Sequence, residues 1–170
     1  TAANDGSGTR AHPLPGAMSA PPRPVVLLSV RSPHVDRLLD GSKTVEFRRR
    51  PWLVPNGSVV LLYGSRERRA IVGSFVVKAT SVGTPASIWR RFGKDSALRR
   101  REFNEYFDGA ESATAITVRT VRALQEPLTL EELRRRQPGF QVPQSYRFIH
   151  GSELDATLDG ERRALLGPRA

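Results

Sequence analysis

Apolar residues form short runs and alternating stretches along the chain, a pattern that predicts strands separated by short helices. The run Val25–Val30 is continuously apolar, as expected of a buried strand. Residues 43–48, KTVEFR, alternate between polar and apolar positions, which is the period of a strand with two different faces. Further strands are predicted between the Asn56–Gly57 turn and Tyr63, at residues 70–83 and 113–124, and, as a short strand or turn, around Tyr146.

Helices are predicted where the apolar spacing changes to three and four residues. Residues 33–41 carry one apolar face, with Ser32 as the expected N-cap and Gly41 as the stop. Thr129 and Glu132 have the spacing of a capping box at the start of another helix. The remaining predicted helices span residues 84–93 and 96–109, with a weak one after residue 150.

This element order predicts an α+β fold: a small, partly open mixed β-barrel of five or more strands flanked by helices. We expect residues 1–24 to be a flexible lead-in, residues 25–150 to form the domain, and residues 151–170 to be a C-terminal helix or tail. Met18 is the only methionine, and we interpret it as a natural start, with residues 1–17 as upstream sequence.

The formal net charge of +10 changes the range of expected partners. A basic excess favours a polyanion, because each neutralised phosphate releases condensed counterions. All but three of the basic residues are arginine, however, and such a skew also arises from a GC-rich genome. The charge therefore leaves both explanations open.

Several classes of protein are excluded by what the sequence lacks. The chain has no cysteine, and its three histidines (His12, His34 and His150) lack metal-ligand spacing. No apolar run approaches the about 20 residues that cross a bilayer, and no signal peptide is visible. We expect no cofactor, no metal, no membrane partner and a cytoplasmic location.

Residues 40–50, DGSKTVEFRRR, carry the candidate chemistry. On a strand, Val45 and Phe47 share one face while Glu46 and Arg48 share the other, so the carboxylate and the guanidinium can pair. Lys43, just after Gly41, can reach the same surface, and we expect the three charges to converge on a solvent-reachable hollow. Such a group suits recognition of a base edge and a phosphate, or proton transfer by a lysine of lowered pKa. A simple surface salt bridge remains the alternative.

The stretch LLSVRSPHVDRLLDGSKTVEFRRR, residues 27–50, resembles the opening of an ASCH domain, a member of the PUA-like superfamily. Gly41, Lys43, Glu46 and Arg48 match its signature G-x-K-x-x-E-x-R. Later segments, including FNEYFDG and PQSYRFI, also resemble the bacterial branch of the family, so the resemblance covers residues 25–149.

The resemblance implies a β-barrel with a cleft bordered by the signature strand, and recognition of RNA or modified nucleotides. Some members of the family are ribonucleases, and one branch consists of amidohydrolases that deacetylate N4-acetylcytidine. That branch is similar at Lys43 but has threonine at the position of Glu46; its further catalytic glutamate would correspond to Glu105. The segment around Ser145 would return to the cleft.

Other side chains are candidates for the same site. If the protein is an enzyme, the catalytic candidates are Lys43, Glu46, Glu105 and Tyr106. The candidates for binding nucleic acid are Ser29, Arg31, Lys43, Glu46, Arg48, Arg49, Trp52, Tyr63, Ser145, Tyr146 and Arg147. Core packing is the competing explanation for Tyr106, and loop anchoring for Trp52.

Three functions follow in order. The first is a module that binds RNA, single-stranded nucleic acid or a modified nucleoside through a basic cleft. The second is a metal-independent ribonuclease or nucleoside amidohydrolase acting in the same cleft. The third is a protein-interaction domain, which would give the signature residues no specific role.

Overall fold

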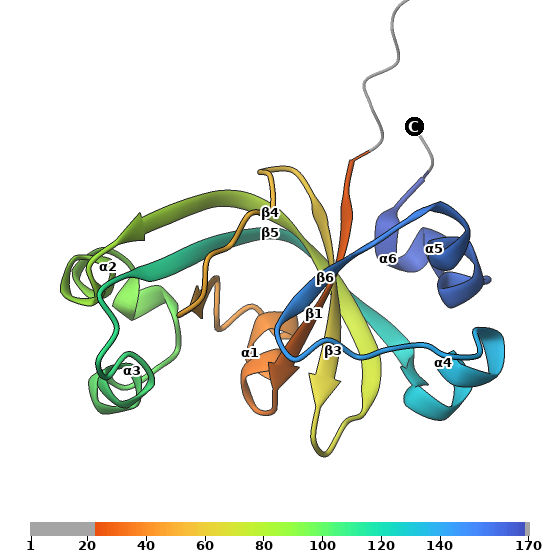
Figure 1. Cartoon of the computed structure of the whole chain (residues 1–170), viewed down its shortest axis with the longest axis horizontal. Helices are drawn as coiled ribbons and strands as arrows, with labels where there is room; N and C mark the ends of the chain where they lie inside the picture. Colours follow the sequence, from red (N-terminus) through yellow and green to blue (C-terminus); the bar gives the residue numbers. More distant parts are fainter. Residues whose placement is uncertain (1–22, 169–170) are drawn as a thin grey trace, which may run out of the picture.

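A computed structural model describes residues 23–168 and contains one mixed sheet of six strands, curled into a half-barrel with helices on its flanks (Figure 1). The strands are β1 (Val25–Arg31), β2 (Val45–Arg48), β3 (Val59–Ser65), β4 (Ala70–Gly83), β5 (Ala113–Thr129) and β6 (Tyr146–Ile149). The α-helices are α1 (His34–Leu39), α2 (Pro85–Phe92), α3 (Arg100–Tyr106), α4 (Leu130–Arg136), α5 (Gly151–Leu158) and α6 (Arg162–Leu166), with a 3₁₀ turn η1 at Gly93–Asp95. The α+β fold predicted from the sequence is confirmed.

The strand order is β2-β5-β4-β3-β1-β6, with β1 parallel to β3 and every other neighbouring pair antiparallel. The strand near the end of the chain, β6, therefore lies beside the first one. The Ser29 N–H donates to the Ser145 carbonyl at 2.9 Å where the two strands separate. This pairing brings two distant parts of the sequence to one edge of the sheet.

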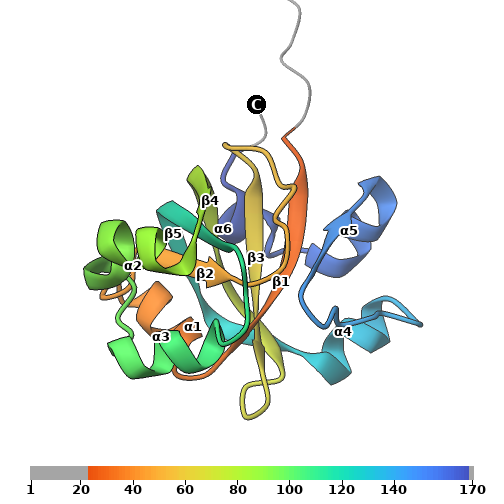
Figure 2. The ribbon, with the colours of Figure 1, turned by 60° about the vertical axis from the view of Figure 1, so that its left-hand side comes forward.

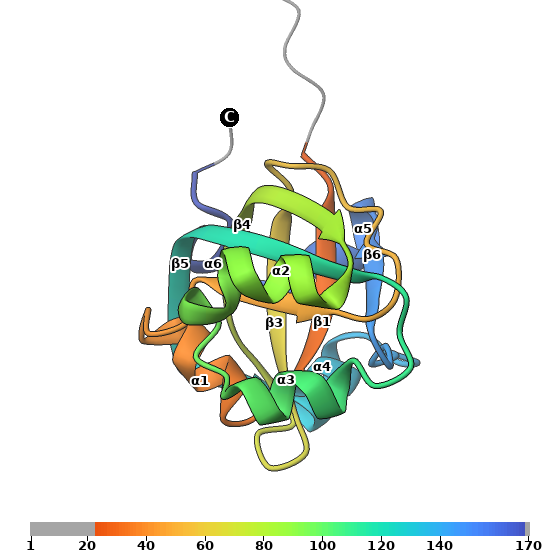
Figure 3. The same cartoon turned by 90° about the vertical axis from the view of Figure 1, so that its left-hand side faces the viewer.

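Three clusters of buried side chains hold the helices against the sheet. The α1 core joins Val35 and Leu38 of α1 to one face of the sheet and includes Trp52. The α4 core packs α4, α5 and α6 against the opposite face, and the α3 core packs α2 and α3 against β2 and β5. Figure 2 shows α1, α2 and α3 on one side of the sheet and α4 and α5 on the other, and Figure 3 shows α2 and α3 at the β2–β5 edge.

The alternation in β2 sends its side chains to two different cores. Val45 and Phe47 belong to the α3 core, as expected of an apolar face. Glu46 lies opposite Ile116 of β5, which belongs to the α1 core, so its side chain points to the opposite side. Both faces of this strand are therefore covered, and its charged face is not a solvent face.

Most element boundaries follow the sequence pattern, with two differences. β5 continues beyond residue 124 because its end pairs with the start of β4, with Ala70 opposite Thr129. The prediction of Ser32 as an N-cap is wrong: α1 begins at His34, and Pro33 precedes it without a side-chain cap. At α4 one half of the expected capping box is present: Thr129 Oγ1 accepts from the Glu132 N–H at 3.2 Å.

The expected lead-in and the candidate start at Met18 lie outside the described residues, except for Arg23 and Pro24. The end of the described chain folds as α5 and α6, and both helices pack on the α4 core. Across residues 23–168, none of the helices has the length and apolar character to cross a membrane.

Candidate nucleic-acid site

Lys43, Glu46 and Arg48 form one ion-paired group, the charged triad. Glu46 lies at its centre, with Oε2 3.2 Å from Lys43 Nζ and Oε1 3.0 Å from Arg48 Nη2. The exposed fractions of the three side chains are 2% for Lys43, 9% for Glu46 and 13% for Arg48. The triad is thus an interior feature, and Arg48 is its most exposed member.

Backbone carbonyls from distant segments complete the geometry of the triad. Lys43 Nζ donates to the Ser96 carbonyl at 3.0 Å, and Arg48 Nη2 donates to the Ser29 carbonyl at 3.1 Å. These two bonds connect β2 to the segment before α3 and to β1. Each buried cation therefore has both a carboxylate and a carbonyl partner, as buried charges require.

Gly41 explains the glycine of the signature. Its φ of +81° lies in the left-handed region that disfavours residues with a Cβ. The reversal at Gly41 ends α1 and brings the Lys43 N–H to the Arg37 carbonyl at 2.9 Å. Lys43 is thereby placed at the entrance of β2 with its side chain directed at Glu46.

The electrostatics of the triad favour a permanently charged carboxylate. Burial by itself would raise the pKa of Glu46, but Lys43 and Arg48 outweigh that effect and leave the pKa below its usual value. A carboxylate held in this way is a weak proton donor or acceptor near neutral pH. Its chemistry is to orient the ammonium and the guanidinium.

His34 lies within electrostatic reach of this group, although the sequence led us to consider it only as a metal ligand. Burial, followed by the charge of Lys43, lowers the pKa of His34 below 6.5, so the imidazole is neutral at pH 7. Its Nδ1 is buried and has no partner among the described residues. The only indication in the sequence was that this histidine follows the first strand closely. Its distance from Lys43 depends on how α1 packs against the sheet.

Several buried polar atoms have no hydrogen-bond partner within residues 23–168. They are Ser32 Oγ, His34 Nδ1, Arg48 Nε, Trp52 Nε1, Ser58 Oγ and Thr80 Oγ1. Arg48 belongs to the triad, and Thr80 lies across β5 from Glu46, with Ile116 between them. An unpaired buried donor or acceptor is costly, so each of these atoms has hydrogen-bonding capacity that the fold does not use.

Trp52 and Tyr146 form an aromatic pair on the side of the α1 core. Their ring centroids are 4.6 Å apart, and Trp52 is 6% exposed, so the indole anchors the loop after β2. The Tyr146 hydroxyl accepts from the Leu53 N–H at 3.1 Å. Leu53 itself is 79% exposed, which leaves an apolar side chain beside this pair.

Three of the predicted site residues point to the opposite face of the sheet. Tyr63 is buried in the α4 core, and Arg147 pairs with Glu153 at 2.6 Å. Ser29 Oγ donates to the Pro143 carbonyl at 2.7 Å, so Ser29 contributes only its carbonyl to the triad. The sheet separates these side chains from Glu46.

The remaining candidates lie at the surface or contribute backbone. Tyr106 is 44% exposed, and its hydroxyl accepts from the Arg49 N–H at 3.3 Å. Glu105 pairs with Arg101 at 2.8 Å on the exposed face of α3. Arg31 is exposed at the end of β1, and Ser145 meets β1 through its carbonyl.

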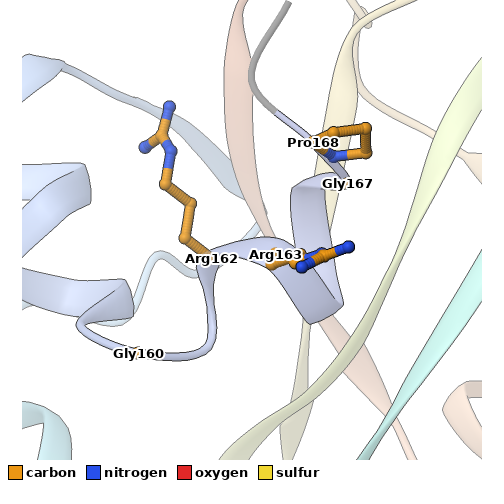
Figure 4. A pocket seen from close by; sticks show the side chains of 5 residues that line it. All are labelled: Gly160, Arg162, Arg163, Gly167 and Pro168. Carbon is orange, nitrogen blue, oxygen red and sulfur yellow. The ribbon is translucent and has the colours of Figure 1, made fainter.

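Two surface cavities lie away from the triad. One, of about 360 Å³, is lined by Asn104, Glu105 and Asp108 of the α3 region. The other, of about 400 Å³, lies at α6, where the side chains of Arg162 and Arg163 point in different directions (Figure 4). The three charges converge as expected, but they are buried, and neither of these two cavities lies at the triad. In the described part of the chain no group of three or more His, Asp or Glu side chains could hold a metal ion.

The curled sheet and the signature triad define the class: an ASCH domain of the PUA-like superfamily. A family model described as a domain of unknown function, DUF365, matches residues 25–136, and the chain belongs to that family. The ASCH resemblance of the sequence is therefore confirmed.

Known proteins support this assignment along most of the chain. An ASCH domain-containing ribonuclease from Zymomonas mobilis is 29% identical over 133 residues, covering 78% of this chain and 89% of the relative. A crystal structure of ASCH from Zymomonas mobilis matches with a TM-score of 0.75 and 27% identity, over 80% of this chain and 94% of that one.

A more distant structure shares the fold alone. The N-terminal domain of McrB from Staphylothermus marinus has a TM-score of 0.53 at 8% identity, over 80% of this chain and 93% of that one. At this identity the similarity carries no information on the site.

Proposed function

We propose that this protein binds single-stranded RNA or a modified nucleotide at the charged triad, with Arg48 as the group that faces the ligand. The observation that carries the proposal is the Nε of Arg48, a buried N–H without a partner among the described residues, on a guanidinium that Glu46 and Ser29 hold in place. Nη2 is occupied by Glu46 and Ser29, which fixes the plane of the guanidinium. A fixed guanidinium with a free N–H suits a phosphate oxygen or a base acceptor.

The surroundings of Arg48 supply two further kinds of contact. The neighbouring Arg49 and Arg50 are exposed and can attract the phosphate backbone. Leu53 and Val82 are exposed apolar side chains, and Val82 shares the sheet face of Arg48 through the register Arg48–Thr114–Val82. Bases of single-stranded RNA are bound by such mixtures of cationic and flat apolar surface.

Binding of labelled single-stranded RNA, followed by fluorescence anisotropy at low and physiological salt, tests the proposal. The informative variant is Arg48→Lys, which keeps a positive charge beside Glu46 but removes the planar donors. We expect its affinity to fall by about tenfold or more, the scale of one lost hydrogen bond to a charged group. Arg101→Lys is the matched control, because Arg101 also pairs with a glutamate but is 88% exposed.

The outcomes separate the function from the site. If wild-type protein binds neither RNA nor a panel of modified nucleosides, N4-acetylcytidine included, even at low salt, the proposed function is wrong. If Arg48→Lys binds as wild type does, the ligand binds elsewhere.

RNA cleavage is the second candidate function, favoured by the name of the Zymomonas relative and by the neutral His34. In this scheme His34 Nδ1 takes the proton of the RNA 2′-hydroxyl while the 2′-oxygen attacks the adjacent phosphorus. Lys43 protonates the departing 5′-oxygen, and Arg48 stabilises the charge on the phosphorus oxygens. Glu46 then orients the two cations and transfers no proton.

Incubation of the protein with short RNAs, with and without EDTA, tests this second candidate. Loss of a general base reduces such rates by about 10²–10⁴-fold, so His34→Gln is expected to be nearly inactive. His150→Gln is the matched control, since His150 is exposed and outside the triad. Equal activity of the two variants would remove His34 from the mechanism.

A further inference from the structure

Four arginines around the β3–β4 hairpin have no hydrogen bond or ion pair to their side chains within residues 23–168. They are Arg31, Arg66, Arg69 and Arg134, here called the hairpin arginines. All four are exposed. Their neighbour Arg68 is paired with Asp36 at 2.6 Å, and Glu67 is the only acidic residue in the hairpin. The surface therefore keeps a net positive charge that the fold itself does not neutralise.

The hairpin arginines come from three elements that meet at one end of the half-barrel. Arg31 lies opposite Ser65 in the β1–β3 register, directly before Arg66. The Leu130 N–H donates to the Arg69 carbonyl at 2.8 Å, which fastens the hairpin to the start of α4. Figure 1 shows this hairpin projecting between the end of β1 and α4.

Arg69 and Arg134 also act on a common neighbour. Both lower the pKa of Tyr63, whose burial has the larger and opposite effect, so each of the two guanidinium groups lies within electrostatic reach of this phenol. The four positions thus lie at one end of the half-barrel, on β1, the hairpin and α4. Two residues along β1 from Arg31, the Ser29 carbonyl accepts from Arg48, so the backbone of β1 connects this end of the half-barrel to the triad, while the Arg31 side chain alternates to the sheet face of the Ser29 side chain.

The hairpin holds two of these arginines in an unfavourable backbone conformation. Arg66 has a φ of +63° and Arg69 has a φ of +43°. Glycine and asparagine adopt this left-handed conformation at a lower energetic cost than arginine. Backbone strain of this kind concentrates at functional sites.

We propose that the hairpin arginines form a track for the phosphate backbone of RNA, leading away from the nucleotide held at the triad. The inference rests on the proposed RNA binding and deepens it: the ligand is a strand of several nucleotides and not a free nucleoside. Guanidinium groups without protein partners lose little when they contact phosphates, and each contact releases condensed counterions.

The test measures the salt dependence of RNA affinity for Arg66→Asn, Arg69→Asn and Arg134→Gln combined. Asparagine accepts positive φ, so the hairpin is expected to be at least as stable as in wild type by thermal unfolding. Each lost phosphate contact reduces the slope of log K against log salt by about 0.7 for single strands, so we expect a slope shallower by about 2. The control combines Arg90, Arg119 and Arg163, each changed to Gln; these are exposed, equally unpaired and distributed elsewhere.

A shallower slope in the hairpin variant alone, with the melting temperature kept, supports the track. If wild type binds RNA but both triple variants change the slope equally, the attraction is diffuse and the track is wrong, while the proposed function stands. If wild type binds free modified nucleosides but no RNA, the track is wrong and only the nucleoside form of the proposal survives.

Discussion

Two ion pairs in this molecule have nearly the same geometry and opposite surroundings. Lys43 and Glu46 are 3.2 Å apart with exposed fractions of 2% and 9%. Arg101 and Glu105 are 2.8 Å apart with exposed fractions of 88% and 63%. The distances alone would rank the second pair as the stronger.

The free-energy cost of breaking each pair follows the opposite order, because one pair is buried and the other is exposed. At the surface, water replaces a lost partner at little cost, and the pair contributes little. In the interior, a lost partner leaves a charge without solvation, so the remaining residues are penalised. A buried network can therefore be essential once present and still contribute little net stability compared with an apolar core.

The largest effect is expected from Glu46→Ala, which leaves Lys43 and Arg48 buried without their carboxylate. We expect the free energy of unfolding to fall by about 3–5 kcal/mol. Urea denaturation measures it, with Glu105→Ala as the control, for which a change below about 0.5 kcal/mol is expected. Similar losses in the two variants would show that the triad is solvated in solution.

Replacing the whole triad is expected to have the opposite effect on stability from removing Glu46 alone. In the combined variant Lys43→Met, Glu46→Leu and Arg48→Met, both the charges and their desolvation cost are removed. Such replacements leave stability unchanged or raise it by about 1–4 kcal/mol. We expect a folded protein by circular dichroism that has lost RNA binding. A folded variant with unchanged RNA affinity would show that the triad has only a structural role.

A smaller effect is expected from acidification, through His34. Because the pKa of His34 is lowered on folding, its contribution to stability is complete above pH 6.5 and is lost as pH falls through the folded pKa. The melting temperature of wild type should decline between pH 7 and pH 5, and His34→Gln should flatten that decline. Lys43 and Arg37 lower this pKa, while Glu46 and Glu102 raise it.

Glu46 adds a second acid-sensitive step at lower pH. Its pKa is also lowered on folding, so its contribution is present above 4.5 and is lost as pH falls below that value. A decline that begins only below pH 4.5 would leave His34 without a part in the effect.

The smallest effect is the coupling between Arg101 and Glu105. A double-mutant cycle with alanine at both positions is expected to give about 0.3–0.5 kcal/mol, the value for exposed helix pairs four residues apart. Adding salt should reduce it further, because exposed charges are screened. A coupling above about 2 kcal/mol would contradict the contrast drawn between surface and interior.

The sequence predicted the fold in detail wherever a local pattern decides the structure. β4 covers residues 70–83 as predicted, because its apolar run and the flanking turns are local signals. The division of β2 into an apolar face and a charged face is confirmed for the same reason. The wrong N-cap at Ser32 shows the limit: the residue types suited a cap, but the backbone between β1 and α1 takes another course.

The surroundings of the candidate site depend on tertiary packing that local patterns do not contain. Nothing near Glu46 in the sequence indicates that Ser96 and Ser29 would supply carbonyls to its two partners. Tyr63 ends an apolar run and Tyr146 follows a polar segment, and they lie on opposite faces because Tyr63 pairs with Ser29 of β1 and Tyr146 pairs with Leu28. Which side of the sheet a residue joins is fixed only when the sheet is assembled.

The position of β6 beside β1 has a consequence for biosynthesis. During translation the first strand emerges early, but its outer edge stays open until the segment of Ser145 has been made. An unpaired strand edge can pair with other chains, so the nascent protein passes through an aggregation-prone stage. Chains interrupted before β6 should for that reason accumulate in inclusion bodies, whereas chains that include β6 cover this edge.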